Sequence, residues 1–165
     1  MEAALRDLVE ADIRACAAMA TESEIGRRYG FTEGGMSASL GRALADSAMA
    51  GSTQRLFAAT SGAVLGFVWM DLAGAFSSAP YLRLIAVAPG LRGSGIGSLL
   101  LAEFERRGGP AGRDFCLLVS DFNTPARDFY ARHGYREIGV LEGFARPGIG
   151  EVIMVKPRPA GGAAP

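Results

Sequence analysis

A glycine-rich segment between a predicted strand and a predicted helix constrains this chain more than any other feature. The segment Val87–Gly108 reads VAPGLRGSGIGSLLLAEFERRG, with glycines at every second position from Gly93 to Gly97. Such a junction presents several unpaired backbone N–H groups in one direction, and the helix dipole adds partial positive charge there. Glycines let a ligand approach the backbone, and Arg92 adds a planar cation suited to phosphate oxygens. The segment therefore predicts a pyrophosphate-binding loop.

The spacing of this loop discriminates between nucleotide ligands. A P-loop for ATP would end in Gly-Lys-Ser/Thr, but here Gly97 is followed directly by Ser98. The dinucleotide fingerprint GxGxxG would need glycine in place of Ser98, although Asp121 stands about where a ribose-binding acid belongs. An NAD-binding oxidoreductase is therefore one alternative. A glycine-rich connection that binds no ligand is another.

Composition and charge limit the partners. The chain has 165 residues, and its seventeen basic side chains balance seventeen acidic ones, so we expect neither nucleic acid nor a membrane surface as a partner. Its length predicts one domain over residues 1–156, with a disordered Pro-, Gly- and Ala-rich tail over 157–165. The two cysteines, Cys16 and Cys116, lie among apolar residues. We interpret them as buried thiols of a cytoplasmic protein, without a disulfide framework or metal site.

The apolar pattern before the loop predicts strands and helices in mixed order. Ala4–Leu8 is a candidate first strand, and Ile13–Ala20 and Met36–Leu44 carry apolar stripes at helical spacing. The runs RLFAAT and VLGFVWMDL are typical of strands, and Ser61-Gly62 between them predicts an antiparallel hairpin. Tyr81–Ala88 is almost continuously apolar, as expected for a strand covered on both faces.

The second half of the chain continues in the same way. Ser98–Arg107 predicts a helix with a Glu103–Arg107 ion pair one turn apart. FCLLVSD predicts a strand, and the helix after it should have Thr124 as its N-cap and Pro125 at its first helical position. YREIGVL and EVIMVKP are the closing strands. Together these elements predict an α/β fold.

Two sequence blocks resemble the GCN5-related N-acetyltransferases (GNAT). The run Arg92-Gly93-Ser94-Gly95-Ile96-Gly97, preceded by LIAVAP, is similar to the family's acetyl-CoA loop, Arg/Gln-x-x-Gly-x-Gly/Ala. The second block is similar to the family pattern N-x-x-A-x-x-F-Y-x-x-x-G-F/Y. Its matching residues here are Asn123, Ala126, Phe129, Tyr130, Gly134 and Tyr135. The resemblance implies a mixed, mostly antiparallel twisted sheet of six to seven strands, flanked by helices, whose splayed central strand pair binds acyl-CoA.

The resemblance also implies roles for particular residues. The family transfers an acetyl group from acetyl-CoA directly to a primary amine, here of a small molecule or a protein. Asn123 would contact the pantetheine arm, and Tyr130 would protonate the departing CoA thiolate. Backbone groups of Ile85, Ala86 and Val87 would hold the pantetheine arm and the acetyl carbonyl, and the pyrophosphate would be held by Arg92, Gly93, Ser94, Gly95, Ile96, Gly97 and Ser98.

The general base is the part that the resemblance does not supply. Many relatives use a glutamate on or near the central strand, where this chain has Tyr81, Arg83 and Ile85. A low-pKa amine or a water relay would relieve the need for one. Arg83, in an otherwise apolar strand, is a candidate contact for an acceptor carboxylate. The candidate bases acting through a water are Glu33, Asp71, Glu142 and Glu151.

His133 is interpreted as a cation in the last helical turn, and Cys116 as an inert thiol that is never acylated. The missing glutamate leaves open a non-catalytic acyl-CoA-binding module, and the sequence is compatible with a homodimer.

Overall fold

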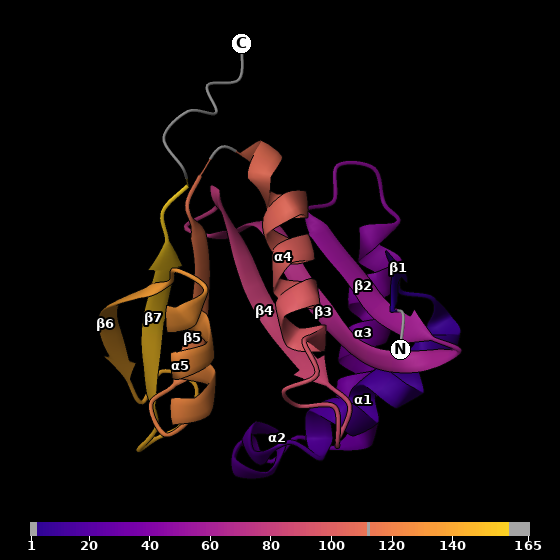
Figure 1. Ribbon diagram of the computed structural model, residues 1–165, viewed down its shortest axis with the longest axis horizontal. Coiled ribbons are helices and arrows are strands. Elements are labelled where there is room, and N and C mark those ends of the chain that lie inside the picture. The colour runs from indigo at the N-terminus through magenta and orange to yellow at the C-terminus, as the bar shows by residue number, and fades with distance from the viewer. Residues whose placement is uncertain (1–2, 112, 159–165) are drawn as a thin grey trace.

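The computed structural model describes residues 3–111 and 113–158, and it contains a seven-stranded sheet with helices on both faces (Figure 1). The strand order is β1-β2-β3-β4-β5-β7-β6, antiparallel throughout except for the parallel pair β4–β5. This architecture confirms the predicted fold class. The strands are β1 Ala4–Asp7, β2 Gln54–Ser61, β3 Ala63–Ala75, β4 Ala79–Val87, β5 Phe115–Ser120, β6 Arg136–Glu142 and β7 Gly150–Lys156. The helices are α1 Ile13–Thr21, α2 Glu24–Tyr29, α3 Glu33–Ser47, α4 Ile96–Gly108 and α5 Thr124–Arg132, with short 3-10 turns η1 Glu10–Asp12 and η2 Gly109–Ala111.

The central strands β4 and β5 separate soon after they meet. Their register contains only the pairs Tyr81–Cys116 and Leu82–Leu117, and beyond these the two strands diverge (Figure 1). A register shift against β3 makes Arg83 an extra residue at this point of β4. The second half of β4 is only partly buried. The expectation of a strand covered on both faces was therefore wrong for this half, because β4 lacks a neighbouring strand there.

Helices cover both faces of the sheet. On one face α4 buries Leu100, Leu101 and Phe104. On the other face α1 and α3 bury the predicted stripes, including Cys16 and Leu40. Both cysteines are buried and free, as expected.

Sequence analysis missed one helix, α2. The helix is only six residues long, with the Ser23 side chain capping its start and Gly30 in the left-handed region at its end. It lies against α1 so closely that a Cβ on Gly26 would be 2.2 Å from the Ala20 carbonyl oxygen. Ser23 and Gly30 are residue types that favour the start and the end of a helix. Six residues are nevertheless too few to show the apolar periodicity by which a helix is predicted.

Smaller differences concern element ends. The helix α4 begins at Ile96, two residues before the predicted start, because Gly95 in the left-handed region serves as its N-cap. The predicted hairpin is confirmed, and it turns at Gly62 with a φ of 76°. Of the tail 157–165, only Pro157 and Arg158 lie within the described residues, and the Arg158 amide donates to Asp114. The single domain over 1–156 stays a prediction, and β7 ends at Lys156.

The predicted ion pair on α4 is confirmed and extended. Glu103 is buried and accepts hydrogen bonds from the side chains of Arg106 and Arg107, each at 2.6 Å to Nε. Arg107 also pairs with Asp7 of β1. The hydrogen bond from Arg106 and then that from Arg107 lower the pKa of Glu103 to about 2, against the cost of burial. The cluster thus fastens α4, which carries the glycine loop, to the sheet.

This shift predicts a pH dependence of stability. Because the folded-state pKa of Glu103 is lowered, its stabilisation is present above the ordinary value near 4.3 and is lost as the pH falls toward 2. Glu103→Gln should lower the unfolding free energy at neutral pH by about 1–3 kcal/mol and flatten its decline between about pH 4.5 and pH 2. The matched control is Glu24→Gln, which removes an exposed pair with Arg28. Urea unfolding across this pH range measures the unfolding free energy of each protein. Equal slopes of this free energy against pH in the wild type and Glu103→Gln would contradict the prediction.

Candidate functional site

The loop before α4 has the geometry of an anion cradle. Gly90, Gly93 and Gly95 have φ values of 81°, 79° and 88°, in the left-handed region that favours glycine. Gly95 caps a helix of 13 residues without a side-chain hydrogen bond, so the amides of the first turn have no protein cap. A Cβ on Gly93 or Gly95 would meet open space within 4 Å. The amides of this loop are therefore accessible to an anion, and Arg92 beside them is exposed.

The end of β4, the start of α4 and one face of α5 meet around this loop. A Cβ on Gly97 would lie 3.5 Å from the Phe129 ring and 3.9 Å from Val87. Ile85 and Val87 are partly buried and pack on the core cluster that α4 covers. The predicted pyrophosphate loop and the predicted pantetheine strand are thus brought together. Cofactor contacts by these residues stay predictions.

The start of α5 differs from the expectation. Asn123, not Thr124, is the N-cap, and its side-chain oxygen accepts a hydrogen bond from the Ala126 amide at 3.3 Å. Thr124 is the first helical residue, so Pro125 takes the second position rather than the first. Asn and Thr both cap helices, and the sequence could not separate two adjacent candidates. The cap occupies the Asn123 oxygen and leaves its amide N–H₂ as the group that can donate to a ligand.

Tyr130 faces inward from α5, as predicted. Its side chain is 7% exposed, and its ring contacts those of Phe129 and Tyr135 at centroid distances of 5.3 and 5.7 Å. Burial, and secondarily the nearby Tyr81, raise the pKa of the Tyr130 phenol above its usual range. The phenol is therefore neutral at physiological pH and carries a proton that it can donate.

His133 has a structural contact that the sequence did not indicate. Its Nδ1 lies 2.7 Å from the Phe129 carbonyl oxygen and its Nε2 lies 3.0 Å from the Ser98 hydroxyl. Because a carbonyl oxygen only accepts, Nδ1 carries a proton. His133 is the C-cap of α5, so it joins the end of that helix to the first turn of α4. No local pattern links positions 98 and 133, and only the fold brings them together.

The four candidate bases lie in different surroundings. Asp71 accepts hydrogen bonds from the Gln54 side chain at 2.6 Å and from the Ala73 amide at 3.0 Å, so both its oxygens have structural partners. Glu142 is exposed on β6. Glu151 is 6% exposed at the start of β7 and accepts a hydrogen bond from the Tyr29 hydroxyl. Only Glu151 combines burial with a position beside the end of β5.

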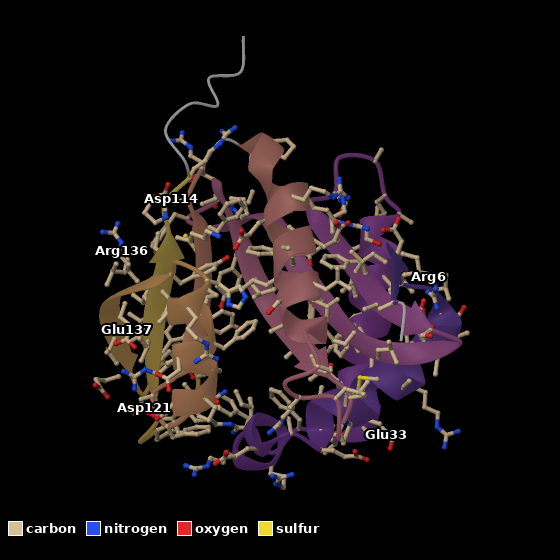
Figure 2. All side chains as sticks on the ribbon, in the orientation of Figure 1. Arg6, Glu33, Asp114, Asp121, Arg136 and Glu137 are labelled. Carbon is tan, nitrogen blue, oxygen red and sulfur yellow. The ribbon has the colours of Figure 1, made fainter. Side chains whose placement is uncertain are left out.

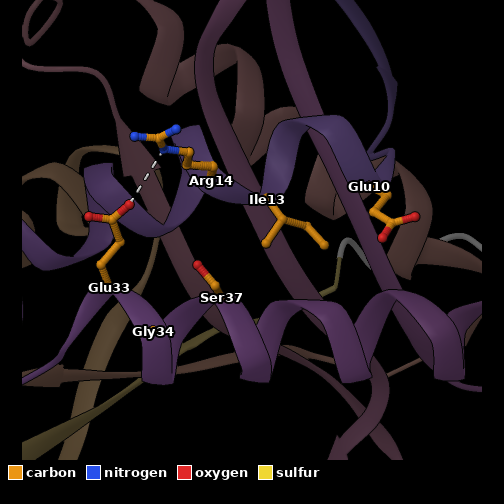
Figure 3. Close-up of a pocket in the computed structure, with 6 residues that line it drawn as sticks. All are labelled: Glu10, Ile13, Arg14, Glu33, Gly34 and Ser37. Carbon is orange, nitrogen blue, oxygen red and sulfur yellow. Dashed lines mark ion pairs between the residues drawn. The ribbon is translucent and has the colours of Figure 1, made fainter.

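Glu33 lies at a different place. It is exposed at the start of α3, and its carboxylate is 3.8 Å from Arg14. Both belong to a shallow hollow of about 460 Å³ between α3 and the start of α1 (Figure 3). Neither the glycine loop nor α5 contributes to it. The lining residues are Glu10, Ile13, Arg14, Glu33, Gly34 and Ser37.

The Cys116 thiol lies in surroundings that disfavour its reactivity. Cys116 is buried, and burial raises the pKa of its thiol, which disfavours the thiolate that nucleophilic attack needs.

Within 3–111 and 113–158 no group of three or more His, Cys, Asp or Glu side chains is placed to hold a metal ion. Over the same ranges, no helix has both the length and the hydropathy that a membrane crossing requires.

Comparison with known proteins identifies the family. The sequence model of the acetyltransferase (GNAT) domain matches residues 52–137, about half of the chain. The chain belongs to the GNAT acetyltransferase family. The matched range contains both motif blocks in full, from the glycine loop to Tyr135. The resemblance is thereby confirmed. No curated protein sequence matches the chain significantly.

Solved structures show the same fold. A GNAT-family acetyltransferase structure from Desulfovibrio desulfuricans has a TM-score of 0.77 at 24% identity, covering 94% of this chain and 99% of that one. The ribosomal-protein-S18-alanine N-acetyltransferase of Escherichia coli has a TM-score of 0.74 at 18% identity and 99% coverage of both chains. A phosphinothricin acetyltransferase from Sinorhizobium meliloti, in complex with acetyl-CoA, has a TM-score of 0.74 at 21% identity, covering 100% and 93%. Acetyl-CoA is therefore a ligand of at least one protein with this fold.

The residues of this chain fit that group. The open amides before α4 and the exposed Arg92 provide donors for a pyrophosphate, and the separation of β4 from β5 frees strand edges for a pantetheine arm. Acetyl-CoA supplies the activated acyl group when it is bound.

The cradle predicts a specific effect of adding a Cβ. Gly95→Ala introduces a left-handed alanine, which costs about 1–2 kcal/mol, and also places a methyl group in the open space before the amides. We expect acetyl-CoA affinity to fall roughly tenfold or more. Gly62→Ala has the same type of backbone strain in the distant β2–β3 turn and should lower only the melting temperature. Calorimetric titration measures the acetyl-CoA affinity of each variant. Equal affinities of the two variants would contradict the assignment of this loop as an anion cradle.

Proposed function

We propose that this protein is an acetyl-CoA-dependent N-acetyltransferase that transfers the acetyl group directly to a primary amine of a small molecule or a protein. The observation that carries the proposal is the position of Tyr130. A buried, neutral phenol lies on the helix next to the glycine loop, where a thiolate leaving group would need a proton. The matched family and the separation of β4 from β5 support it.

The proposed mechanism assigns one task to each part of the chain. The amides of Ile96, Gly97 and Ser98 and the Arg92 side chain bind the pyrophosphate, while Ser94 shapes the loop through its bond to the Leu91 carbonyl. The backbone of β4 from Ile85 to Val87 aligns the pantetheine arm and the acetyl carbonyl. Asn123 donates its amide to the arm. Tyr130 gives its proton to the thiolate as the carbon–sulfur bond breaks.

The acceptor is an amine in both named relatives that support this proposal. One acts on an alanine of a ribosomal protein and the other on phosphinothricin. The discriminating experiment is release of CoA thiol from acetyl-CoA with free amino acids, polyamines and short peptides as acceptors. Acceptor-dependent release supports transfer. Tight acetyl-CoA binding without release from any amine would favour the non-catalytic acyl-CoA-binding module instead.

Assembly and location are further parts of the proposal. We expect a cytoplasmic enzyme because its two cysteines are free thiols. We expect no nucleic-acid or membrane partner because its formal net charge is zero. A homodimer stays a prediction that light scattering on the purified protein would test.

Removing the Tyr130 hydroxyl should separate catalysis from binding. Tyr130→Phe should lower turnover by roughly 10- to 10⁴-fold, the usual range for an acid catalyst, with nearly unchanged acetyl-CoA affinity. The control is Tyr135→Phe, whose ring contacts Tyr130 but whose hydroxyl is buried with no hydrogen-bond partner among the described residues. The Tyr135→Phe enzyme should retain the turnover of the wild type. Steady-state thiol release measures both, and a Tyr130→Phe enzyme with wild-type turnover would reject the role.

A further inference from the structure

A buried carboxylate lies at the end of β5 where three distant segments meet. Glu151, the second residue of β7, pairs in register with Ser120, the last residue of β5. Its carboxylate accepts a hydrogen bond from the hydroxyl of Tyr29 in α2, which also lies 2.9 Å from the Ser120 hydroxyl. Glu151 and Ser120 are 6% and 2% exposed. The carboxylate is thus held in a fixed position by the helix that sequence analysis missed.

Glu151 points to the face of the sheet opposite the glycine loop. Leu117 and Val119 of β5 and Val152 of β7 belong to the core that α4 covers. Successive residues of a strand point to opposite faces, so Ser120 and Glu151 face the other side. Figure 1 shows α2 at this end of β4 and β5, and Figure 2 shows Asp121, the residue after β5, at the same end. Glu151 therefore lies on the face opposite the cofactor loop, at the end of β5 where β4 has already diverged from it.

The surroundings of Glu151 extend toward Tyr130. Tyr81 of β4 packs beside Cys116 of β5 on the same face. Burial raises the pKa of the Tyr81 phenol, the positive charge of Arg83 lowers it and the negative charge of Glu151 raises it further. Tyr81 in turn lies near enough to raise the pKa of Tyr130. Tyr130 belongs to the core on the α4 side, so Glu151 and Tyr130 lie on opposite faces of the sheet, each near Tyr81.

The charged neighbours of Glu151 leave it without a cationic partner. Arg146, in the loop before β7, donates to the Tyr29 backbone carbonyl at 2.5 Å. Asp121 accepts from the Gly150 amide at 3.0 Å, and Glu142 lies on the adjacent strand β6. Over the described parts of the chain, no ion pair joins Glu151 to a lysine, arginine or histidine. A buried carboxylate in this state favours a bound cation, because burial of an unpaired charge is costly.

We propose that Glu151 binds the acceptor amine as an ammonium ion and accepts its proton, so that the acceptor is a strongly basic primary amine entering beside α2. This inference rests on the proposed N-acetyltransferase function. Tyr29 and Ser120 are positioning residues that hold the carboxylate. Such an amine is almost fully protonated at neutral pH, so a proton acceptor is required before it can attack a thioester.

One proton passes from the ammonium to the Glu151 carboxylate, directly or through a water, and the freed nitrogen lone pair forms a bond with the thioester carbon. The carbon–sulfur bond breaks, and the thiolate takes the proton of Tyr130. The second proton lost by the nitrogen returns to the Tyr130 oxygen. The products are the N-acetyl amine, CoA thiol and the proton that Glu151 releases to solvent.

The test compares benzylamine, a strongly basic amine, with aniline, which is neutral at pH 7. Glu151→Gln should lower kcat/KM for benzylamine at pH 7 by roughly 100-fold or more, and the loss should shrink as the pH approaches the pKa of the amine. With aniline, which needs no deprotonation before attack, the change should be less than about threefold. The control is Glu22→Gln, an exposed carboxylate just before α2, which should behave as wild type with both amines.

Binding is measured separately from turnover. Saturation-transfer NMR with the CoA-bound protein should detect benzylammonium with the wild type and with Glu22→Gln but not with Glu151→Gln, while all three keep the acetyl-CoA affinity. A Glu151→Gln enzyme with the wild-type pH profile for benzylamine, or with unchanged benzylammonium binding, would overturn the proposal. Absence of thiol release from every amine would contradict N-acetyl transfer instead, and the NMR result would still decide whether Glu151 binds the cation.

Discussion

The loss of pairing between β4 and β5 is the constraint on which the rest of the site depends. Two parallel strands at the centre of a sheet normally pair along their length, but here only two residue pairs form before the strands diverge. Backbone groups of β4 beyond Leu82 are left for a ligand. The bulge at Arg83 bends β4 at this point. The glycine loop follows directly after the end of β4.

The separation would let the two faces of the sheet contribute to one reaction in the proposed mechanism. On one face, α4 is fastened by the Glu103 cluster and α5 by the His133–Ser98 contact, so the loop amides and Tyr130 are held in one frame. On the other face, α2 and β7 bring Tyr29 and Glu151 to the same opening. A cofactor held on the first face and an amine held on the second would meet between the strands, which is the geometry that a direct transfer needs.

The sequence predicted the parts that are encoded locally. The glycine spacing from Gly93 to Gly97, the apolar stripes of α1 and α3 and the inward side of Tyr130 are properties of short segments, and each was found where expected. Contacts between distant segments were not predictable in this way. Glu151 was one of four candidate bases of equal standing, and only its pairing with Ser120 and its bond to Tyr29, 122 positions away, distinguish it. The unpaired half of β4 was misjudged because an apolar strand has the same sequence whether a neighbouring strand or a ligand covers it.

The most direct test of the account is the melting temperature of the protein with saturating acetyl-CoA, with NADH as the control. A ligand at about 100 times its dissociation constant adds roughly 2.7 kcal/mol, which for a domain of this size corresponds to a shift of roughly 5 to 11 °C. The account predicts this shift with acetyl-CoA and none with NADH. A shift with NADH alone would contradict it, because the loop would then serve the dinucleotide that its spacing disfavours.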